Sequence, residues 1–397
     1  MSRIERLVVI FWLGILALLV IVVALVVWQA AQFWRTPLGP GLELSTQTAI
    51  LSRPPATLTP FIAVEEASAS PQPTLSPQPA DSPSPTASPT PLSTLTPIPS
   101  PTTAPEISES LCGGPAVMTL LAVGSDARSD SYQYGLADVI RIIRVDFATP
   151  KVSILEFPRD LWVEIPEIVD NIGVENEKLN QAYLYGNPGF GYYDGPGAGP
   201  GLLARTLDMN FGIHPDHYLA VNMQTFVKIV NAVGGVDVTL PYTIDHRFKA
   251  GHMHLDGQLA LTLARNRIEG VFERGGYQNL VLCALRDKLL NPAVLPQIPE
   301  IIASFQGSVQ TDLTPEQISQ LACLGTQLDT GYLIFASFPE ELFKGTRTYD
   351  PVFKYREFTW DVDFNILRDY VSRFNAGTWP VGPSESASPY DIGSFCP

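Results

Sequence analysis

Three arginines stand close together in a chain that is otherwise acidic. Arg265, Arg267 and Arg274 lie within ten positions of the 397-residue sequence, whose formal net charge is −15 at pH 7. One cation at a helix C-terminus is favoured by about 0.3–1 kcal/mol, which accounts for one arginine but not for three. Several converging guanidinium groups suit a multiply charged oxyanion, because each gives a bidentate, charge-assisted contact. The alternative is a solvated basic helix end with a few surface ion pairs.

Two helices are expected to position these arginines. A run of apolar residues predicts one buried helix that delivers Arg265 and Arg267 at its C-terminal end, with leucines at Leu255, Leu259, Leu261 and Leu263. A glycine-containing loop follows, and a second helix is expected from about Gln278. The arginines would then meet between the end of one helix and the beginning of the next.

Beyond residue 113 the chain alternates between strand and helix patterns. Short apolar runs bounded by turn residues predict strands at 117–123, 139–147, 151–157, 161–165, 217–222, 236–240 and 332–338. Helical patterns occupy 178–185, 201–211, 223–233 and 314–324. Mixed strands with interleaved helices predict an α/β fold, a three-layer α-β-α sandwich with a central mixed sheet, over residues 113–376. Residues 377–397 are expected to form a C-terminal tail.

Residues 7–29 predict a transmembrane signal anchor. The sequence is apolar and uncharged from position 7 to position 28, which is long enough to span a bilayer. No convincing cleavage site follows, so a removed signal peptide is not expected. Arg3 and Arg6 precede the segment, and the positive-inside rule therefore places residues 1–6 in the cytoplasm. We expect a single-pass protein of the cell membrane whose main domain lies outside the cytoplasm.

Residues 30–112 predict a linker between the anchor and the domain. Proline, serine and threonine dominate its middle, and almost no large apolar residue is present there to be buried. Such a composition favours a disordered, extended chain. The linker is therefore expected to act as a stalk that carries the domain.

All four cysteines lie beyond the apolar segment, where an even count favours disulfides. Four cysteines allow three connectivities. We expect Cys283–Cys323 to tie two helices, and Cys112–Cys396 to join the ends of the domain, because domain termini commonly lie close together. No cysteine spacing indicates zinc, and the pair His252 and His254 lacks a further ligand at the right spacing, so no metal is expected there.

Several short motifs occur in a fixed order and resemble the LytR–CpsA–Psr (LCP) family over about residues 115–290. They are GSDAR at 124–128, Asp138, FPRD at 157–160, KLNQAY at 178–183, NAVGGVDV at 231–238, LDGQLALTLARNR at 255–267 and FERGGYQN at 272–279. The resemblance implies an extracytoplasmic phosphotransferase. Such an enzyme moves a glycopolymer from a polyprenyl-pyrophosphate carrier to a hydroxyl of peptidoglycan, with Mg2+ assisting.

The resemblance also implies the site residues. Arg159, Arg265, Arg267 and Arg274 match the arginines that bind the pyrophosphate, and we expect them to be catalytic. Arg128 and Gln278 are expected to contact the substrate. Asp126 and Asp138 match the family's metal-binding aspartates, and carboxylate oxygens suit Mg2+; the alternative for both is loop capping. Asp160 is expected to cap a turn rather than to orient Arg159.

Five residues depart from the family pattern at positions that bear on catalysis. Leu136 stands where members usually carry an arginine, Val271 where they carry an acid, and Glu156 where they carry a serine; Tyr277 and Asn279 replace an arginine and a glutamine. Arg141 and Arg144, unusual in their strand, either offset the lost arginine or are edge charges that discourage aggregation. Two function classes remain: an active transferase, and a non-catalytic protein that binds polyprenyl-linked or wall polymers. Transcriptional regulation is not expected, because no cytoplasmic domain or basic nucleic-acid patch is present.

Overall fold

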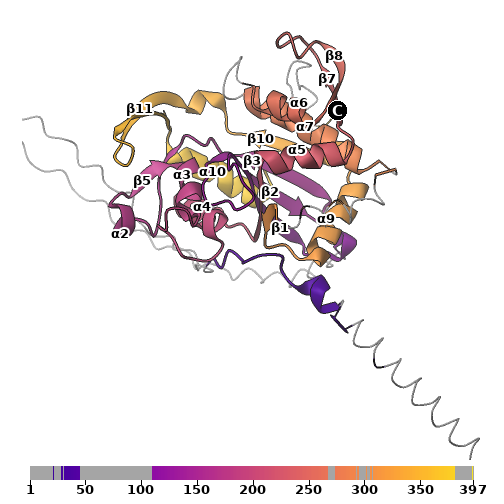
Figure 1. Cartoon of the computed structure of the whole chain (residues 1–397), viewed down its shortest axis with the longest axis horizontal. Coiled ribbons are helices and arrows are strands. Elements are labelled where there is room, and N and C mark those ends of the chain that lie inside the picture. The colour runs from indigo at the N-terminus through magenta and orange to yellow at the C-terminus, as the bar shows by residue number, and fades with distance from the viewer. Residues whose placement is uncertain are drawn as a thin grey trace, which may run out of the picture. The chain divides into compact units, whose positions relative to one another are not determined.

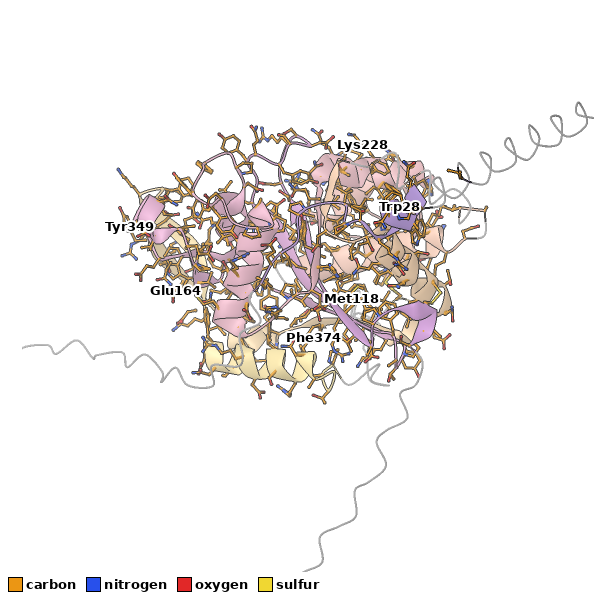
Figure 2. All side chains as sticks on the ribbon, turned by 90° about the horizontal axis from the view of Figure 1, so that it is seen from below. Trp28, Met118, Glu164, Lys228, Tyr349 and Phe374 are labelled. Carbon is orange, nitrogen blue, oxygen red and sulfur yellow. A yellow bond between two sulfur atoms is a disulfide. The ribbon has the colours of Figure 1, made fainter. Side chains whose placement is uncertain are left out.

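The computed structural model describes residues 21, 28, 29, 31–44, 110–266, 273–291, 293, 294, 301, 305, 307–380 and 396 (Figure 1). Most of the predicted anchor, as well as Arg267 and Val271, lies outside these residues. Within the described part, no helix is both long enough and apolar enough to cross a membrane. Figure 2 shows the side chains, with buried Met118 and Phe374 among those labelled.

A six-stranded mixed sheet forms the centre of the domain, in the order β10-β3-β2-β1-β6-β9. The strands are β1 (Val117–Ser125), β2 (Ala137–Asp146), β3 (Lys151–Glu156), β6 (His217–Asn222), β9 (Val309–Thr311) and β10 (Leu333–Ser337). β1 is parallel to β6 and β3 is parallel to β10, whereas β2 is antiparallel to both β1 and β3. The C-terminal ends of β1, β3, β6 and β10 therefore share one edge of the sheet with the beginning of β2. The predicted α/β class and mixed central sheet are confirmed.

Helices pack on both faces of this sheet. Along β1, Leu121 and Val123 face α3 (Leu179–Gly186), α4 (Ala198–Phe211) and α10 (Phe364–Asn375). Met118 and Leu120 point the other way, toward α9 (Pro315–Gln327), as alternation along a strand requires. The sheet is thus apolar on both faces, which is why its strands read as nearly continuous apolar runs.

A second apolar cluster lies over the sheet where the arginine-rich stretch begins. It joins α5 (Met223–Ala232), α6 (Gly257–Ala264) and α7 (Glu273–Leu289) to the hairpin of β7 (Val236–Leu240) and β8 (Gly251–Leu255). Figure 1 shows these elements gathered at the top of the view. The predicted helix that included Leu255 is wrong at its start, because Leu255 pairs with Val236 in the hairpin and Asp256 caps α6, accepting the amide of Leu259 at 2.8 Å.

The second predicted helix also begins earlier than expected. α7 begins at Glu273, and Gly275 and Gly276 are part of it rather than of a loop. A Cβ added to Gly275 would lie 3.0 Å from a carboxylate oxygen of Glu156. The glycine therefore lets the first turn of α7 approach the end of β3 closely.

Smaller elements complete the domain. They include two further hairpins, one of β4 (Trp162–Glu164) with β5 (Asn176–Lys178) and one of β11 (Lys344–Asp350) with β12 (Tyr355–Asp361). Short helical turns are α2 (Val169–Ile172), η1 (Leu111–Gly113), η3 (Thr330–Tyr332) and η4 (Glu340–Leu342). The sequence patterns did not predict β11, β12 or α10.

Part of the stretch predicted as linker packs on the domain. Leu42 is buried among the apolar residues that cover β1 and α4. The amide of Leu38 donates to the carbonyl of Leu313 at 3.2 Å, and the Tyr218 hydroxyl donates to the carbonyl of Pro40 at 3.1 Å. Docking of this segment was not expected from the composition of residues 30–112.

Both disulfides form, but the predicted pairing is wrong. Cys112 bonds to Cys323 and Cys283 bonds to Cys396. η1 packs against α9, which brings Cys112 to Cys323. Cys283 of α7 instead faces the sheet, where Cys396 reaches the same apolar cluster as Ile154. Proximity of the domain ends therefore did not decide the pairing.

Candidate functional site

A β-bulge at the strand-end edge of the sheet sets the position of Asp138. Gly124 pairs with Val139 and Ser125 pairs with Ala137, so Asp138 is an extra residue between two normal pairs. A bulge bends its strand and re-aims the side chain that it carries. Asp138 is thereby placed at the edge where β1, β3 and β10 end.

Two arginines from distant parts of the chain meet at Asp138. The Arg159 guanidinium forms an ion pair with the Asp138 carboxylate through Nη1 and Oδ1. Nη2 of Arg274 donates to the backbone carbonyl of Asp138 at 3.3 Å. Arg159 comes from the loop after β3, and Arg274, which is 6% exposed, comes from the first turn of α7. The sequence-predicted convergence of arginines is therefore present for this pair.

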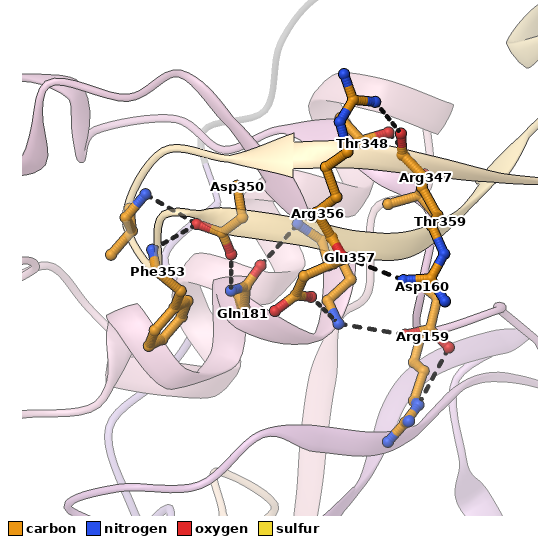
Figure 3. Close-up of polar contacts among 12 residues, drawn as sticks. Arg159, Asp160, Gln181, Arg347, Thr348, Asp350, Phe353, Arg356, Glu357 and Thr359 are labelled. Carbon is orange, nitrogen blue, oxygen red and sulfur yellow. Dashed lines mark hydrogen bonds and ion pairs between the residues drawn. The ribbon is translucent and has the colours of Figure 1, made fainter.

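Asp160 extends the charged network on the other side of Arg159. Its Oδ2 lies 3.3 Å from Nε of Arg159, and its Oδ1 lies 3.5 Å from Nζ of Lys178, which also pairs with Glu357 (Figure 3). The expectation that Asp160 only caps a turn is wrong, because its carboxylate contacts the Arg159 side chain directly. Burial would lower the pKa of Arg159, but the neighbouring Asp160 and Asp138 carboxylates outweigh it and raise that pKa above its usual value.

A pocket opens beside these arginines. It is lined by charged residues on one side and by apolar and aromatic residues on the other, namely Glu156, Pro158, Arg159, Asp160, Arg274, Ser337, Phe338 and Trp360. β3 and β10 are parallel and end here, and clefts outside the carboxyl ends of strands are common ligand sites in open α/β sheets. The pocket combines two guanidinium groups with an apolar wall, which suits an anion attached to an apolar or sugar group.

Arg141 lies buried beneath the pocket. It is 3% exposed, and its Nη2 donates to Glu156 at 2.8 Å and to Oε1 of Gln278 at 3.1 Å. Its guanidinium also lies 5.8 Å from the centre of the Phe335 ring. β2 is an interior strand, so the interpretation of Arg141 and Arg144 as edge charges is wrong. Glu156 compensates the buried Arg141, which explains why an acid stands at this position.

Gln278 connects this pair to the end of α6. Its Nε2 donates to the carbonyl of Ala264 at 3.2 Å, one residue before Arg265. Arg265 is the C-cap residue of α6 and is exposed. Gln278 thus holds the backbone beside Arg265 close to the buried Arg141, but the structure gives no direct contact between Arg265 and Arg159.

Arg128 is not brought into the arginine cluster. It lies exposed in the loop after β1 and forms no hydrogen bond or ion pair with the described residues. Its neighbours Ser129 and Asp130 instead bind Asn222 at the end of β6. A contact of Arg128 with substrate stays a prediction.

Asp126 caps the loop that leads to Asp138. Its Oδ1 accepts the amide of Leu136 at 2.6 Å, and its own amide donates to the Leu136 carbonyl at 3.1 Å. No group of three or more His, Cys, Asp or Glu residues placed to hold a metal occurs in the described part of the chain. Mg2+ usually binds one or two carboxylates together with waters and substrate phosphates. Binding of Mg2+ by Asp126 and Asp138 stays a prediction, and it would need further oxygens from waters or a phosphate group.

The departures from the family pattern have local packing roles where the structure describes them. Leu136 packs against the core on the α3 and α4 side of the sheet. Tyr277 is buried in the second apolar cluster, and Asn279 is buried on α7.

Several pocket residues were missed by sequence reasoning. Ser337 and Phe338 are the last two residues of the strand predicted at 332–338, and nothing in that strand indicated a site. Trp360 lies on β12, whose signal was the alternation of residues in 355–361. Glu156 departs from the family pattern, and the FPRD motif that follows it already places it close to Arg159 in the sequence.

The protein is thus an α/β protein with an arginine–aspartate pocket at the carboxyl edge of its central sheet. The chain belongs to the LytR_cpsA_psr family, whose model matches residues 106–341.

Two named relatives match about half of this chain. The polyisoprenyl-teichoic acid–peptidoglycan teichoic acid transferase TagU of Bacillus cereus (strain AH820) is 30% identical over 208 residues, which are 51% of this chain and 62% of TagU. The regulatory protein MsrR of Staphylococcus aureus (strain COL) is 27% identical over 211 residues, which are 51% of this chain and 58% of MsrR. The match thus spans about three fifths of these relatives.

A solved structure agrees with the fold. The crystal structure of TagV from B. subtilis superposes with a TM-score of 0.51 at 22% identity, covering 66% of this chain and 98% of TagV. At this identity the likeness concerns the fold.

Proposed function

We propose that this protein is a membrane-anchored, extracytoplasmic phosphotransferase that moves a glycopolymer from a polyprenyl-pyrophosphate carrier to a peptidoglycan hydroxyl. The observation that carries the proposal is the meeting of Arg159 and Arg274 at Asp138 on the wall of a half-apolar pocket. Family membership and the likeness to TagU support the same reaction class. The anchor at residues 7–29 is part of this proposal.

The reaction that this site would perform is a phosphoryl exchange. The acceptor hydroxyl oxygen bonds to the phosphorus that carries the saccharide, and the bond from that phosphorus to the bridging oxygen breaks. Polyprenyl phosphate leaves, and the hydroxyl releases one proton. Negative charge grows on the bridging oxygen, so guanidinium groups that are already in place stabilise the transition state more than the ground state.

The surrounding residues keep these guanidinium groups in place. Asp138 and Asp160 hold Arg159 from two sides, and the first turn of α7 holds Arg274 against the bulge. Asp126 and Asp138 would hold Mg2+, which would neutralise negative charge on the phosphate oxygens. The apolar side of the pocket excludes water from the pyrophosphate, which strengthens each charged contact.

A second function is favoured by one observation. Leu136 packs into the core at a position where the family resemblance places an active-site arginine. A site lacking that charge would bind the lipid pyrophosphate but transfer slowly. The second candidate is therefore a non-catalytic protein that holds a polyprenyl-linked or wall polymer.

One assay separates the two functions. The purified full chain is given a polyprenyl-pyrophosphate saccharide, a glycan acceptor and Mg2+, and release of polyprenyl phosphate is followed. We expect release that falls at least about tenfold in Arg159→Lys, because lysine cannot reproduce a bidentate contact. Arg247→Lys, an exposed arginine paired with Asp245 on the β7–β8 connection, is the matched control. Saccharide-lipid binding without any release would favour the non-catalytic function, and absence of both would contradict the proposal.

A further inference from the structure

The β11–β12 hairpin has two chemically different faces. Cross-strand pairing puts Asp350, Thr348, Glu357 and Thr359 on the face that turns inward, where all four are buried or half-buried. The residues of the other face are here called the hairpin face and comprise Gly345, Arg347, Tyr349, Arg356, Phe358 and Trp360. All of them except half-buried Trp360 are exposed. Figure 2 shows Tyr349 at the margin of the molecule.

The inward face fixes the hairpin to the domain. Lys178 pairs with Glu357, and Nε2 of Gln181 donates to Asp350 at 3.4 Å (Figure 3). Asp350 also accepts the amides of Val352 and Phe353 in the turn, at 2.8 and 2.7 Å. The hairpin is therefore a supported platform and not a free loop.

The same arrangement leaves the hairpin face with positive charge only. Its two arginines form no ion pair with a described residue; Nη1 of Arg347 donates to the carbonyl of Arg356 at 3.4 Å, and Nη1 of Arg356 donates to that of Arg347 at 3.2 Å. These bonds hold both guanidinium groups over the strands and leave their remaining N–H groups open to solvent. Unpaired arginines are notable on a chain whose net charge is −15.

Aromatic rings alternate with these arginines. Arg347 is directly opposite Phe358, and Tyr349 is directly opposite Arg356. In the next row Gly345 is opposite Trp360, and a Cβ on Gly345 would lie 3.0 Å from the Phe358 ring. The glycine therefore leaves the two rings, which contact each other with centroids 4.8 Å apart, accessible from outside.

The hairpin face is continuous with the pocket, because Trp360 belongs to both. A chain that leaves the pocket past Trp360 would meet an aromatic ring and an arginine in each following row. Rows on one face of a strand repeat every ~7 Å. Aromatic rings stack on sugar or polyol carbons, and guanidinium groups bind phosphate. This alternation fits a polymer in which polyols or sugars alternate with phosphodiesters.

We propose that the hairpin face binds the anionic, phosphodiester-containing part of the polymer whose lipid pyrophosphate occupies the pocket. This inference rests on the proposed function, since it assigns a second contact to the same substrate. Exposed aromatic and basic residues also suit contact with a membrane surface. Charge complementarity and continuity with the pocket favour the polymer instead.

The test uses the full chain in detergent and two probes. Fluorescent poly(glycerol phosphate) reports on the hairpin face, and farnesyl pyrophosphate reports on the pocket. We expect Arg347→Gln/Arg356→Gln to weaken polymer binding about tenfold and to reduce its salt dependence, because two phosphate contacts are lost. Farnesyl pyrophosphate binding should not change. Trp360 is left intact because it lines the pocket.

A matched control removes the same charge elsewhere. Arg247→Gln/Lys249→Gln, in the β7–β8 connection, should leave polymer binding unchanged; an equal loss in both double variants would show non-specific attraction and overturn the proposal. Equal binding of neutral dextran would also overturn it.

A last experiment uses the full chain in nanodiscs and measures hydrogen exchange of residues 344–361. Protection by phosphatidylglycerol, and not by the polymer, would make the hairpin face a membrane contact and overturn the proposal. A failure of the proposed function is distinguishable, because it appears as farnesyl pyrophosphate binding that is insensitive to Arg159→Ala.

Discussion

Arg141 and Glu156 are cross-strand neighbours on β2 and β3, and their side chains form an ion pair of 2.8 Å beneath the pocket. Each residue of the pair looks anomalous alone. Arg141 is a buried arginine inside an interior strand, and Glu156 is an acid on the wall of the proposed anion-binding pocket. Glu156 neutralises the buried guanidinium, while Gln278 links the pair to α7. The acid therefore supports the floor of the pocket instead of opposing its charge.

We predict that Glu156→Ala lowers the free energy of unfolding by about 2–4 kcal/mol, because it leaves a buried guanidinium unpaired. Replacing both residues, as Arg141→Met/Glu156→Leu, should recover most of this loss, since a packed apolar pair needs no compensation. Urea unfolding of the single and double variants measures the coupling. Additive losses would show that the two side chains do not act as a pair.

Arg159 and Arg265 should differ in what their removal does to stability. Arg159→Ala leaves the partly buried Asp138 and Asp160 carboxylates without their shared cation, so unfolding should become easier by about 1–3 kcal/mol. Arg265→Ala removes an exposed side chain at the end of α6 and should cost less than about 0.5 kcal/mol.

Both variants should weaken farnesyl pyrophosphate binding about tenfold, since each loses a charge-assisted contact. Calorimetric titration beside thermal unfolding checks the two effects separately. Normal binding by Arg265→Ala would remove that residue from the site.

A buried acid should make the stability of the domain fall as pH rises. Burial, assisted by the neighbouring Asp350 and Glu357 carboxylates, raises the pKa of Glu177 from 4.5 to about 8, and Lys178 offsets this only in part. Between these values the folded protein holds a proton that the unfolded chain releases, so the free energy of unfolding decreases from about pH 4.5 to about pH 8.

The Glu177→Gln variant tests this assignment. It should be less pH-dependent in that interval and about 1–3 kcal/mol more stable than the natural chain at pH 8, because an amide cannot ionise. Chemical denaturation from pH 5 to pH 9 measures both curves. Parallel curves for the two proteins would show that Glu177 is not the titrating group.

Restoring two family-type residues should accelerate transfer. Val271→Asp with Leu136→Arg should raise the transfer rate while the affinity for the lipid stays the same, as expected when interactions made mainly in the transition state are restored. Multiple-turnover kinetics with the saccharide lipid check the rate. A natural rate that is already fast, and is abolished by Glu273→Gln, would show that Glu273 has taken the place of the missing acid.

A protease added to intact cells should cut the chain between about residues 68 and 105, because this proline-, serine- and threonine-rich stretch has few groups to bury. Antibodies against the domain would then detect a shortened fragment. Complete protection of the chain would contradict the predicted topology, in which residues 1–6 are cytoplasmic.

Strands buried on both faces were readable from the sequence, and half-exposed ones were not. β1, β2 and β3 contain apolar runs that only burial explains. β8 and β12 expose most of their residues and therefore lack the continuous apolar runs of the buried strands. Trp360 was missed because its role depends on the pairing of β12 with β11, which the alternation in residues 355–361 does not specify.

Site residues that belong to a sequence motif were predictable. Their contacts with residues far away in the sequence were not. Arg159 and Arg274 followed from motifs, but their common partner depends on a bulge that moves Asp138 out of normal register. The disulfide pairing likewise depends on how η1 and α7 pack against the rest of the domain, and the order of the cysteines in the sequence does not determine that packing.

The docking of Leu42 changes the role expected for the proline-rich segment that follows it. Leu42 packs in the core, and the amide of Leu111 bonds to the carbonyl of Phe147, so residues 45–109 leave one domain and return to it. In the proposed membrane topology, the length of this segment would therefore not set the distance between the anchor and the domain. The residues between the proposed anchor and Pro37 would set it instead, so insertions within residues 45–109 should leave that distance unchanged.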